Sequence, residues 1–165
     1  MLCSSLTTKM EELKSEDCAH RVFLGLGANL GDKEATILRA YRHIERLIGT
    51  IKCQSAFFYS EPWGFESENS FVNSVVCVET SQTPRQVLHR TKLIERLLGK
   101  MWQHATERQH EAEGPIYHDR PIDIDILLYD DLQVDEPDLK IPHPLMQQRE
   151  FVMQPLRQIK SLLER

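Results

Sequence analysis

Residues 120–129 read Arg120-Pro121-Ile122-Asp123-Ile124-Asp125-Ile126-Leu127-Leu128-Tyr129. Isoleucine, leucine and tyrosine dominate this segment and its proline stands near the start, which is the pattern of a β-strand. Side chains of a strand point alternately to opposite faces, so one core-facing side is predicted for Ile122, Ile124, Ile126 and Leu128. The other side then carries Asp123, Asp125, Leu127 and Tyr129. The segment therefore predicts a strand with two acids on one face.

The two aspartates of this strand are candidate metal ligands. Their Cα atoms would lie roughly 6.5 Å apart, so both carboxylates can converge on a hard cation. Mg²⁺ prefers oxygen ligands and is usually bound by one or two carboxylates together with substrate phosphates. The alternative is a pair of solvated surface acids, but Leu127 and Tyr129 extend the same face and make it partly apolar. The pattern favours magnesium-dependent phosphate chemistry.

The composition limits the classes of protein to which the chain can belong. It has 165 residues, 41% of them hydrophobic, and a formal net charge of −5. One domain with a substantial core is expected at this length, and the acidic balance argues against a nucleic-acid binder, which would need a basic surface. The cysteines are scattered without a CxxC spacing, as expected for free thiols in a reducing compartment: Cys3, Cys18, Cys53 and Cys77.

The sequence predicts neither a membrane span nor a signal peptide. No run approaches roughly 18 apolar residues, and the N-terminus lacks the apolar region of a secretion signal. A cytoplasmic protein without a membrane partner is therefore expected. Residues 1–20 are polar and weakly periodic and predict a flexible extension, whereas residues 21–165 predict a single domain.

The order of strand and helix patterns predicts the fold class. Residues 21–27, 50–59 and 71–80 read as strands, in addition to the aspartate strand. Helices are predicted over residues 33–48, between a cap at Asp32 and a stop at Gly49, and over residues 84–98, between a cap at Thr83 and a stop at Gly99. The resulting βαββαβ order predicts an α+β, ferredoxin-like sandwich, in which both helices cover one face of an antiparallel sheet. A C-terminal helical segment is predicted from Arg149 onward.

Some segments lie outside this four-strand pattern. Residues 61–70 predict a loop, and the long polar stretch over residues 100–119 predicts either a lid or binding loop or a tolerated surface insertion. Pro142 and Pro144 restrict His143, which lies between them, to an extended setting. With Arg149 close in sequence, His143 is a candidate phosphate contact, the alternative being a structural histidine.

Two further motifs allow a ligand interpretation. The glycines of residues 25–31 do not form GxGxxG or GxxxxGK[ST], so they predict a tight turn and no dinucleotide or P-loop site. Phe71 and Asn73 share a strand face, where they could stack on and hydrogen-bond to a planar ring. Phe151 could form a second wall. The alternative is that both phenylalanines are ordinary core aromatics.

Five segments taken together resemble the 6-hydroxymethyl-7,8-dihydropterin pyrophosphokinase family of folate biosynthesis. They are residues 27–32, 59–64, 71–73, 119–125 and 141–151, with the sequences Gly-Ala-Asn-Leu-Gly-Asp, Tyr-Ser-Glu-Pro-Trp-Gly, Phe-Val-Asn, Asp-Arg-Pro-Ile-Asp-Ile-Asp, and Ile-Pro-His-Pro followed by Arg-Glu-Phe. They occur in the order that the family has and span roughly residues 21–157. The segment that contains Asp123 and Asp125 is the most specific.

The resemblance implies that the protein transfers pyrophosphate from ATP to the hydroxymethyl group of the pterin and releases AMP. It implies that Asp123 and Asp125 bind two Mg²⁺ ions bridging the ATP phosphates, and that Arg120 acts beside them in catalysis. The implied pterin site consists of Glu61, Pro62, Trp63, Phe71, Asn73 and Phe151. The implied ATP site consists of Leu88, Lys92, Glu95, Lys100, Ile126, Lys140, His143 and Arg149. ATP and the pterin would be the partners of a monomer that binds no nucleic acid and no membrane.

The chain also departs from the family pattern. Lys100 stands where many members have an arginine, and it keeps the charge but loses the planar fork. The segment 101–119 looks longer than is typical and has only Arg108 as an arginine. Two other interpretations share the element order: an RNA-binding module, and a small-molecule-binding module without catalysis. The two acids of the last strand favour the enzyme.

Overall fold

The computed structural model describes residues 19–61, 70–106 and 121–165. Its strands are β1 (His20–Ala28), β2 (Thr50–Gln54), β3 (Phe58–Ser60), β4 (Phe71–Thr80), β5 (Asp123–Tyr129), β6 (Val134–Glu136) and β7 (Leu139–Ile141). Its helices are α2 (Lys33–Leu47), α3 (Pro84–Thr106) and α4 (Glu150–Leu163), the last preceded by a 3₁₀ turn over Met146–Gln148.

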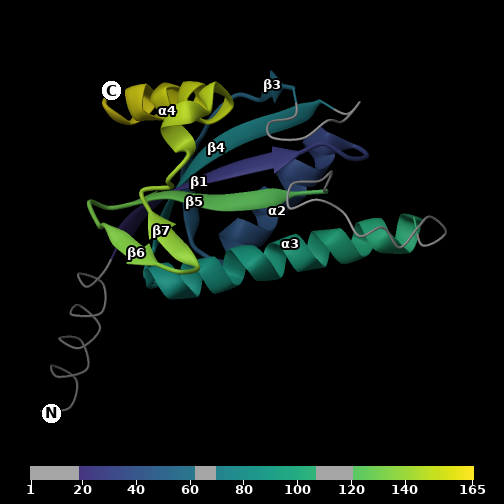
Figure 1. Cartoon of the computed structure of the whole chain (residues 1–165), viewed down its shortest axis with the longest axis horizontal. Coiled ribbons are helices and arrows are strands. Elements are labelled where there is room, and N and C mark those ends of the chain that lie inside the picture. Colours follow the sequence, from purple (N-terminus) through teal and green to yellow (C-terminus); the bar gives the residue numbers. More distant parts are fainter. Residues whose placement is uncertain (1–18, 62–69, 107–120) are drawn as a thin grey trace, which may run out of the picture.

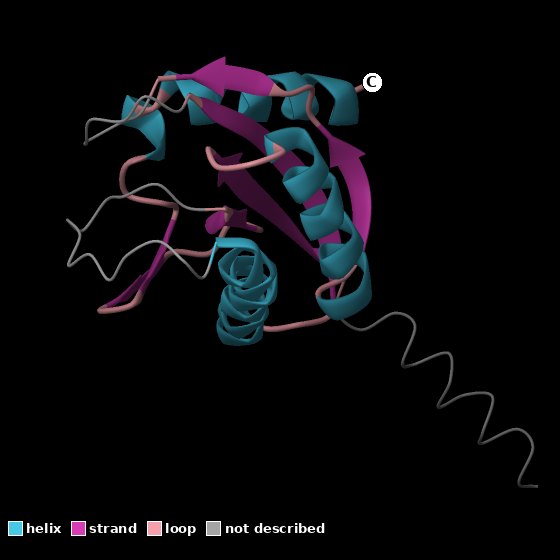
Figure 2. Ribbon diagram, turned by 90° about the vertical axis from the view of Figure 1, so that its right-hand side faces the viewer, coloured by secondary structure: helices cyan, strands magenta, loops and turns pink. Residues whose placement is uncertain are grey.

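One antiparallel sheet organises the molecule. Its strands lie in the order β2-β4-β1-β5, and β3 pairs with the first residues of β4. Helices α2 and α3 cover one face of this sheet and α4 covers the other (Figure 1). Seen from the side, the strands form a twisted layer between helices (Figure 2). The predicted α+β, ferredoxin-like sandwich is confirmed, with the C-terminal helix on the face that the first two helices leave open.

The apolar residues form two core clusters that share the sheet. The larger cluster lies under α2 and α3, where Ile37 and Ile94 pack against Leu24, Val76 and other sheet residues. The smaller cluster lies under α4, where Leu156 and Ile159 pack against Phe23, Val75 and Leu127. Because both faces of the central strands are covered, β1 and β4 are almost continuously apolar.

The predicted boundaries of α2 are confirmed within about one residue. Its first turn is capped by Asp32, whose side chain accepts a hydrogen bond of 3.2 Å from the backbone N–H of Ala35. Gly49 follows the helix where the chain passes β4, and a Cβ atom on this residue would lie 2.1 Å from the carbonyl oxygen of Glu79. Only glycine allows this close approach, so Gly49 is required by packing as well as by the end of the helix.

The second predicted strand is divided in the structure. Residues 50–59 form β2 and the start of β3, separated at Ser55–Phe57. At the break, the hydroxyl of Ser55 accepts a hydrogen bond from the N–H of Val75 at 2.9 Å, so a side chain takes the place of a ladder carbonyl. This local competition by serine interrupts the strand, which a count of β-forming residues does not reveal.

Helix α3 continues beyond its predicted end at Gly99 and reaches Thr106. The prediction of a stop was wrong because glycine inside a helix costs only about 1 kcal/mol and does not by itself terminate hydrogen bonding along the axis. The first part of the predicted loop over residues 100–119 is therefore helical. The remainder, residues 107–119, lies outside the described residues, as do residues 62–69 of the predicted loop before β4.

A β-bulge in β5 changes which of its residues face each core. Consecutive residues of β1 pair with Ile126 and Leu128, so Leu127 is the extra residue. Tyr129 consequently packs in the cluster under α2 and α3, while Leu128 packs on the α4 side. The predicted faces of these two residues were wrong because strict alternation was applied across an irregularity. The predicted sides of the isoleucines and aspartates that precede the bulge hold.

Candidate active site

A cavity with about 660 Å³ of empty space, part of it open to solvent, lies on the α4 side of the sheet. We call it the sheet cavity. Its lining contains eight of the residues predicted from the sequence: Glu61, Phe71, Asn73, Asp123, Asp125, His143, Arg149 and Phe151. These residues come from four separate parts of the chain, and the antiparallel pairing of β4, β1 and β5 brings four of them together, Phe71 and Asn73 with Asp123 and Asp125.

Two glycines of β1 form the floor of the sheet cavity. Gly27 pairs with Asn73 of β4 on one side and with Asp123 of β5 on the other, and Gly25 pairs with Asp125. A Cβ atom on Gly27 would lie 3.2 Å from Oδ1 of Asn73, inside the space that the cavity occupies. Sequence reasoning placed both glycines at the end of the strand over residues 21–27 and in the tight turn that follows it, and assigned neither to a ligand site. Their spacing of two within a strand was the available signal that a ligand approaches this face.

Asn73 is held in one orientation by the neighbouring strand. Its side chain is buried, with 5% exposure, and its Nδ2 donates to the carbonyl oxygen of Phe58 at 3.1 Å and to Oγ of Ser60 at 2.7 Å. The side-chain oxygen therefore faces the floor of the cavity. Phe71 and Phe151 line the same cavity from β4 and from the start of α4. The arrangement offers aromatic surfaces and an oriented amide to a flat, polar-edged ligand.

The aspartates of β5 meet at the cavity, as their spacing predicted. Partial burial raises the pKa of Asp125 to about 7, and the negative charges of Asp123 and Glu95 act in the same direction. The positive charges of Lys92 and Arg149 oppose this shift. Asp125 thus lies where carboxylates outweigh cations. A divalent cation would favour its ionised form, so this charge balance fits a metal site.

His143 lies beside Asp125, with its Nε2 atom 3.8 Å from Oδ2 of the aspartate. Its backbone N–H donates to the carbonyl oxygen of Leu127 at 3.0 Å, and its Nδ1 accepts from the N–H of Leu145 at 3.2 Å. Burial lowers the pKa of His143, the nearby charge of Arg149 lowers it further, and Asp123 opposes both. The imidazole is therefore fixed against β5 with Nε2 directed toward the acids.

A second cavity with about 670 Å³ of empty space, also partly open, lies at the free edge of β5. We call it the edge cavity. Leu88 and Lys92 of α3, Ile126 of β5 and Lys140 of β7 line it, as do residues 137–139, which form the β6–β7 turn and the first residue of β7. Sequence reasoning missed Pro137, Asp138 and Leu139 because it predicted no hairpin there, although a Pro-Asp pair between two short strands is a turn signal.

The two cavities meet at Asp125 and His143, which line both. Because β5 is the edge strand of the sheet, its residues can line both the sheet cavity and the cavity at the edge. Asp125 therefore lies between a recess with aromatic walls and a recess with lysines. Such a junction suits a reaction between two bound substrates.

Other predicted residues lie elsewhere. Glu95 is not among the described residues that line either cavity. Its carboxylate accepts a hydrogen bond of 2.9 Å from the N–H of Ile124, and burial raises its pKa. Lys100 belongs to α3, but its side chain lies outside the described part of the chain, as do Pro62, Trp63 and Arg120 altogether.

The acids do not form a complete metal cage by themselves. Within the described residues, no group of three or more His, Cys, Asp or Glu side chains is placed to hold an ion. This agrees with magnesium sites that take one or two carboxylates and complete their coordination with water and substrate phosphates. Within the same residues, no helix has the length and apolar character that crossing a bilayer requires.

Comparisons with known proteins place the whole chain in context. The family described as 7,8-dihydro-6-hydroxymethylpterin-pyrophosphokinase (HPPK) matches residues 23–161. A 2-amino-4-hydroxy-6-hydroxymethyldihydropteridine pyrophosphokinase of Porphyromonas gingivalis is 42% identical over 143 residues, which are 86% of this chain and 92% of the relative. The protein of the same description from Aquifex aeolicus is 37% identical over 139 residues, 84% of this chain and 79% of the relative.

Solved structures of larger proteins share the fold. An HPPK-DHPS crystal structure in complex with substrates matches with a TM-score of 0.61 at 13% identity, covering 85% of this chain and 40% of that chain. A Plasmodium falciparum HPPK-DHPS triple mutant matches with a TM-score of 0.60 at 17% identity, covering 88% and 41%. The chain thus spans about two fifths of these structures, and the likeness concerns the fold. On the sequence matches, the chain belongs to the 7,8-dihydro-6-hydroxymethylpterin-pyrophosphokinase family.

Proposed function

We propose that the sheet cavity and the edge cavity hold the two substrates of the family's reaction and that Asp125 lies between them. This protein is an ATP-dependent pyrophosphokinase of folate biosynthesis, as its family membership establishes. The reaction transfers pyrophosphate from ATP to the hydroxymethyl oxygen of 6-hydroxymethyl-7,8-dihydropterin and yields the pterin diphosphate and AMP. The observation that carries the assignment of the site is the position of the acids at the junction of two unlike cavities.

The sheet cavity is proposed as the pterin site. Phe71 and Phe151 would flank the ring, and the oriented amide of Asn73 would read its hydrogen-bonding edge, with Glu61 at the rim. The glycine floor supports this role, because any side chain at Gly27 would fill the space. Pro62 and Trp63 remain predicted contributors to the same site.

The edge cavity is proposed as the nucleotide site. Leu88 and Ile126 offer apolar surface to a base, whereas Lys92 and Lys140 offer positive charge to phosphates. His143 and Arg149 would hold the phosphate chain near the acids, since both line the cavity in which the acids meet. Lys100, Glu95 and Arg120 remain predictions, and the position of Glu95 indicates that it would support β5.

Asp123 and Asp125 are proposed to hold magnesium, two ions in the complete complex. Bound there, Mg²⁺ would neutralise phosphate charge and orient the reacting phosphorus. The protein's own side chains would align the substrates and compensate charge. The cavity walls align the pterin hydroxyl with the phosphate chain, and Arg149 and the lysines offset its negative charge. Alignment and charge compensation are the main sources of catalysis in phosphoryl transfer.

The replacement Asp125→Asn tests this assignment. It keeps the shape of the side chain and removes a charge that the site disfavours without metal, so the protein should fold normally. Formation of AMP from ATP, Mg²⁺ and the hydroxymethyl dihydropterin should fall by roughly 10²–10⁴-fold, because a ligand of the reacting ion is lost.

The matched control is Asp131→Asn, which removes an exposed acid at the turn after β5. It should retain wild-type turnover. Calorimetry should show that binding of Mg²⁺ with a non-hydrolysable ATP analogue is weaker in Asp125→Asn and unchanged in Asp131→Asn. Wild-type rates of AMP formation by Asp125→Asn would refute the metal role.

A further inference from the structure

Arg85 joins the first turn of α3 to the β6–β7 hairpin. Its Nη1 atom lies 2.7 Å from Oδ2 of Asp138 in the turn of the hairpin, and its Nη2 atom pairs with a carboxylate oxygen of Glu136 in β6. One guanidinium therefore meets two carboxylates of the same hairpin, which its planar fork of donors allows. Figure 1 shows the hairpin beside the beginning of α3.

Asp138 belongs to the wall of the edge cavity. It lines this cavity together with Lys140 of the same hairpin and Leu88 of α3. Lys140 pairs with Asp135, the residue directly opposite on β6. Arg85 provides the positive charge at Asp138, and its hydrogen bond lowers the pKa of this carboxyl group. Asp138 is thus an ionised acid in the cavity wall, and the arginine that pairs with it belongs to α3.

We propose that Arg85 is a positioning residue for the nucleotide, because it holds the β6–β7 hairpin against α3 and neutralises Asp138 beside the phosphates. The inference rests on the proposed function, since it takes the edge cavity as the ATP site. ATP brings several negative charges into this cavity. Without Arg85, the carboxylates of Asp138 and Glu136 would be uncompensated and would repel the nucleotide.

The first experiment compares Arg85→Ala with wild-type protein at saturating pterin and Mg²⁺. The KM for ATP should rise roughly three- to tenfold, the size expected for one or two uncompensated, partly screened charges near a multiply charged ligand, while kcat changes less than twofold. Arg85→Lys should restore part of the affinity, because an ammonium keeps the charge but cannot engage both acids. Arg96→Ala removes an exposed arginine of the same helix outside both cavity linings, and should leave the KM unchanged.

Two further measurements separate charge compensation from a merely structural role. The difference in KM between Arg85→Ala and wild type should shrink when ionic strength rises from about 0.05 M to about 0.5 M, because salt screens the repulsion. The double variant Arg85→Ala/Asp138→Asn should regain most of the ATP affinity. If Arg85→Ala proves too unstable to assay, as its thermal midpoint would show, this double variant and Arg85→Lys carry the test.

The outcomes distinguish this inference from the proposed function. An unchanged KM for ATP in Arg85→Ala, in a preparation whose wild type turns over normally, overturns the role of Arg85 alone. A raised KM that neither salt nor Asp138→Asn relieves also overturns it, because the defect is then structural. A wild-type protein that forms no AMP overturns both. A raised KM that salt and the second substitution relieve supports the inference.

Discussion

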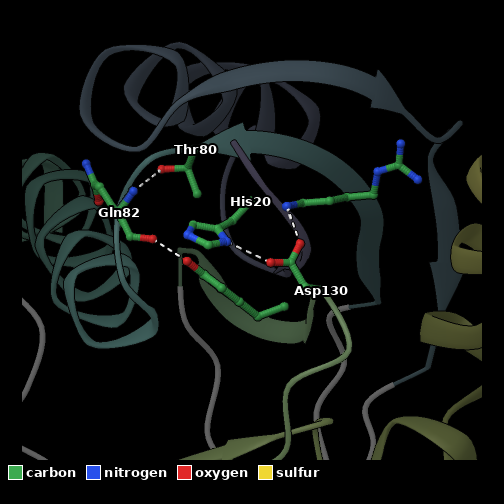
Figure 3. A network of polar contacts seen from close by, with 6 residues as sticks. His20, Thr80, Gln82 and Asp130 are labelled. Carbon is green, nitrogen blue, oxygen red and sulfur yellow. Dashed lines mark hydrogen bonds and ion pairs between the residues drawn. The ribbon is translucent and has the colours of Figure 1, made fainter. Parts of the chain in front are cut away.

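Asp130 connects the ends of β1 and β5 (Figure 3). Its carboxylate accepts hydrogen bonds of 2.7 Å from the backbone N–H of Arg21 and from Nδ1 of His20. Its backbone has φ = 46°, in the left-handed region that aspartate and asparagine tolerate better than most residues. Beside it, the hydroxyl of Tyr129 donates to the carbonyl oxygen of Gln82, so the same corner also holds the segment before α3. One short polar side chain thus ties the start of β1 to the residue that follows β5.

We expect Asp130→Asn to destabilise the protein in a pH-dependent way. Burial would raise the pKa of Asp130, but the Arg21 N–H and His20 outweigh it, so the folded-state pKa lies below its ordinary value. A depressed carboxyl pKa stabilises the fold above the unfolded-state pKa, and that contribution disappears as the pH falls through the folded-state value. Denaturant unfolding should show a loss of about 0.5–1 kcal/mol at pH 7, small because the side chain is more than a third exposed, and little difference below about pH 3.

The neighbouring exposed acid supplies the control for this prediction. Asp131→Asn should change the free energy of unfolding by less than about 0.5 kcal/mol at either pH. Equal stability of Asp130→Asn and wild type at pH 7 would mean that the corner is held by its backbone alone.

At the level of elements, α4 has two roles. Its apolar side, with Leu156 and Ile159, covers the face of the sheet opposite to α2 and α3. Its first turn contributes Phe151 to the sheet cavity, two residues after Arg149. The side chain of Gln158 also accepts a hydrogen bond of 2.8 Å from the N–H of Ala56, which ties the helix to the break between β2 and β3. The position of the aromatic wall therefore depends on the packing of this helix.

Leu156→Ala should weaken pterin binding as well as stability. The side chain is 1% exposed, so its truncation should cost about 2–5 kcal/mol in the free energy of unfolding. Because the cavity left behind lies under α4, the dissociation constant for the pterin should rise more than that for ATP. Ile37→Ala, at a fully buried residue of α2 in the other cluster, should cost similar stability without this selective effect. Equal losses of pterin affinity in both variants would argue against a link between α4 and the site.

For the whole molecule, we propose that residues 21–165 form a single domain, because the two core clusters share one sheet and no described element packs apart from it. The large apolar residues exposed on the described surface are separated in the chain: Leu38, Tyr59, Leu97, Leu132 and Leu162. They belong to α2, β3, α3, the turn after β5 and α4, and isolated exposed apolar residues do not require a partner.

The protein is therefore expected to be monomeric. Sedimentation equilibrium at micromolar concentration should give a mass near 19.2 kDa, with and without nucleotide. A mass twice as large, or one that rises with concentration, would contradict this prediction and would direct attention to an interface between copies of the chain.

The sequence alone determined the features that depend on neighbours along the chain. Strand alternation placed Asp123 and Asp125 together on one face of their strand and Phe71 and Asn73 together on one face of theirs, and the Asp32 cap marked the start of α2. The ferredoxin-like arrangement then followed from the βαββαβ order, because few topologies connect such elements with short, right-handed crossovers. The family resemblance added the assignment of residues to substrates, and these assignments remain predictions.

The tertiary structure decided what depends on residues distant in sequence. Leu127 becomes a bulge only by pairing with β1, and Gly25 and Gly27 become a cavity floor only between Asn73 and the acids. The β6–β7 hairpin lines the edge cavity, and Arg85 pairs with two of its acids from another element. The meeting of the two cavities at Asp125 likewise requires β5 to be the edge strand. Local patterns record the preferences of single segments, whereas a site between segments depends on how strands pair and on which side chains are absent.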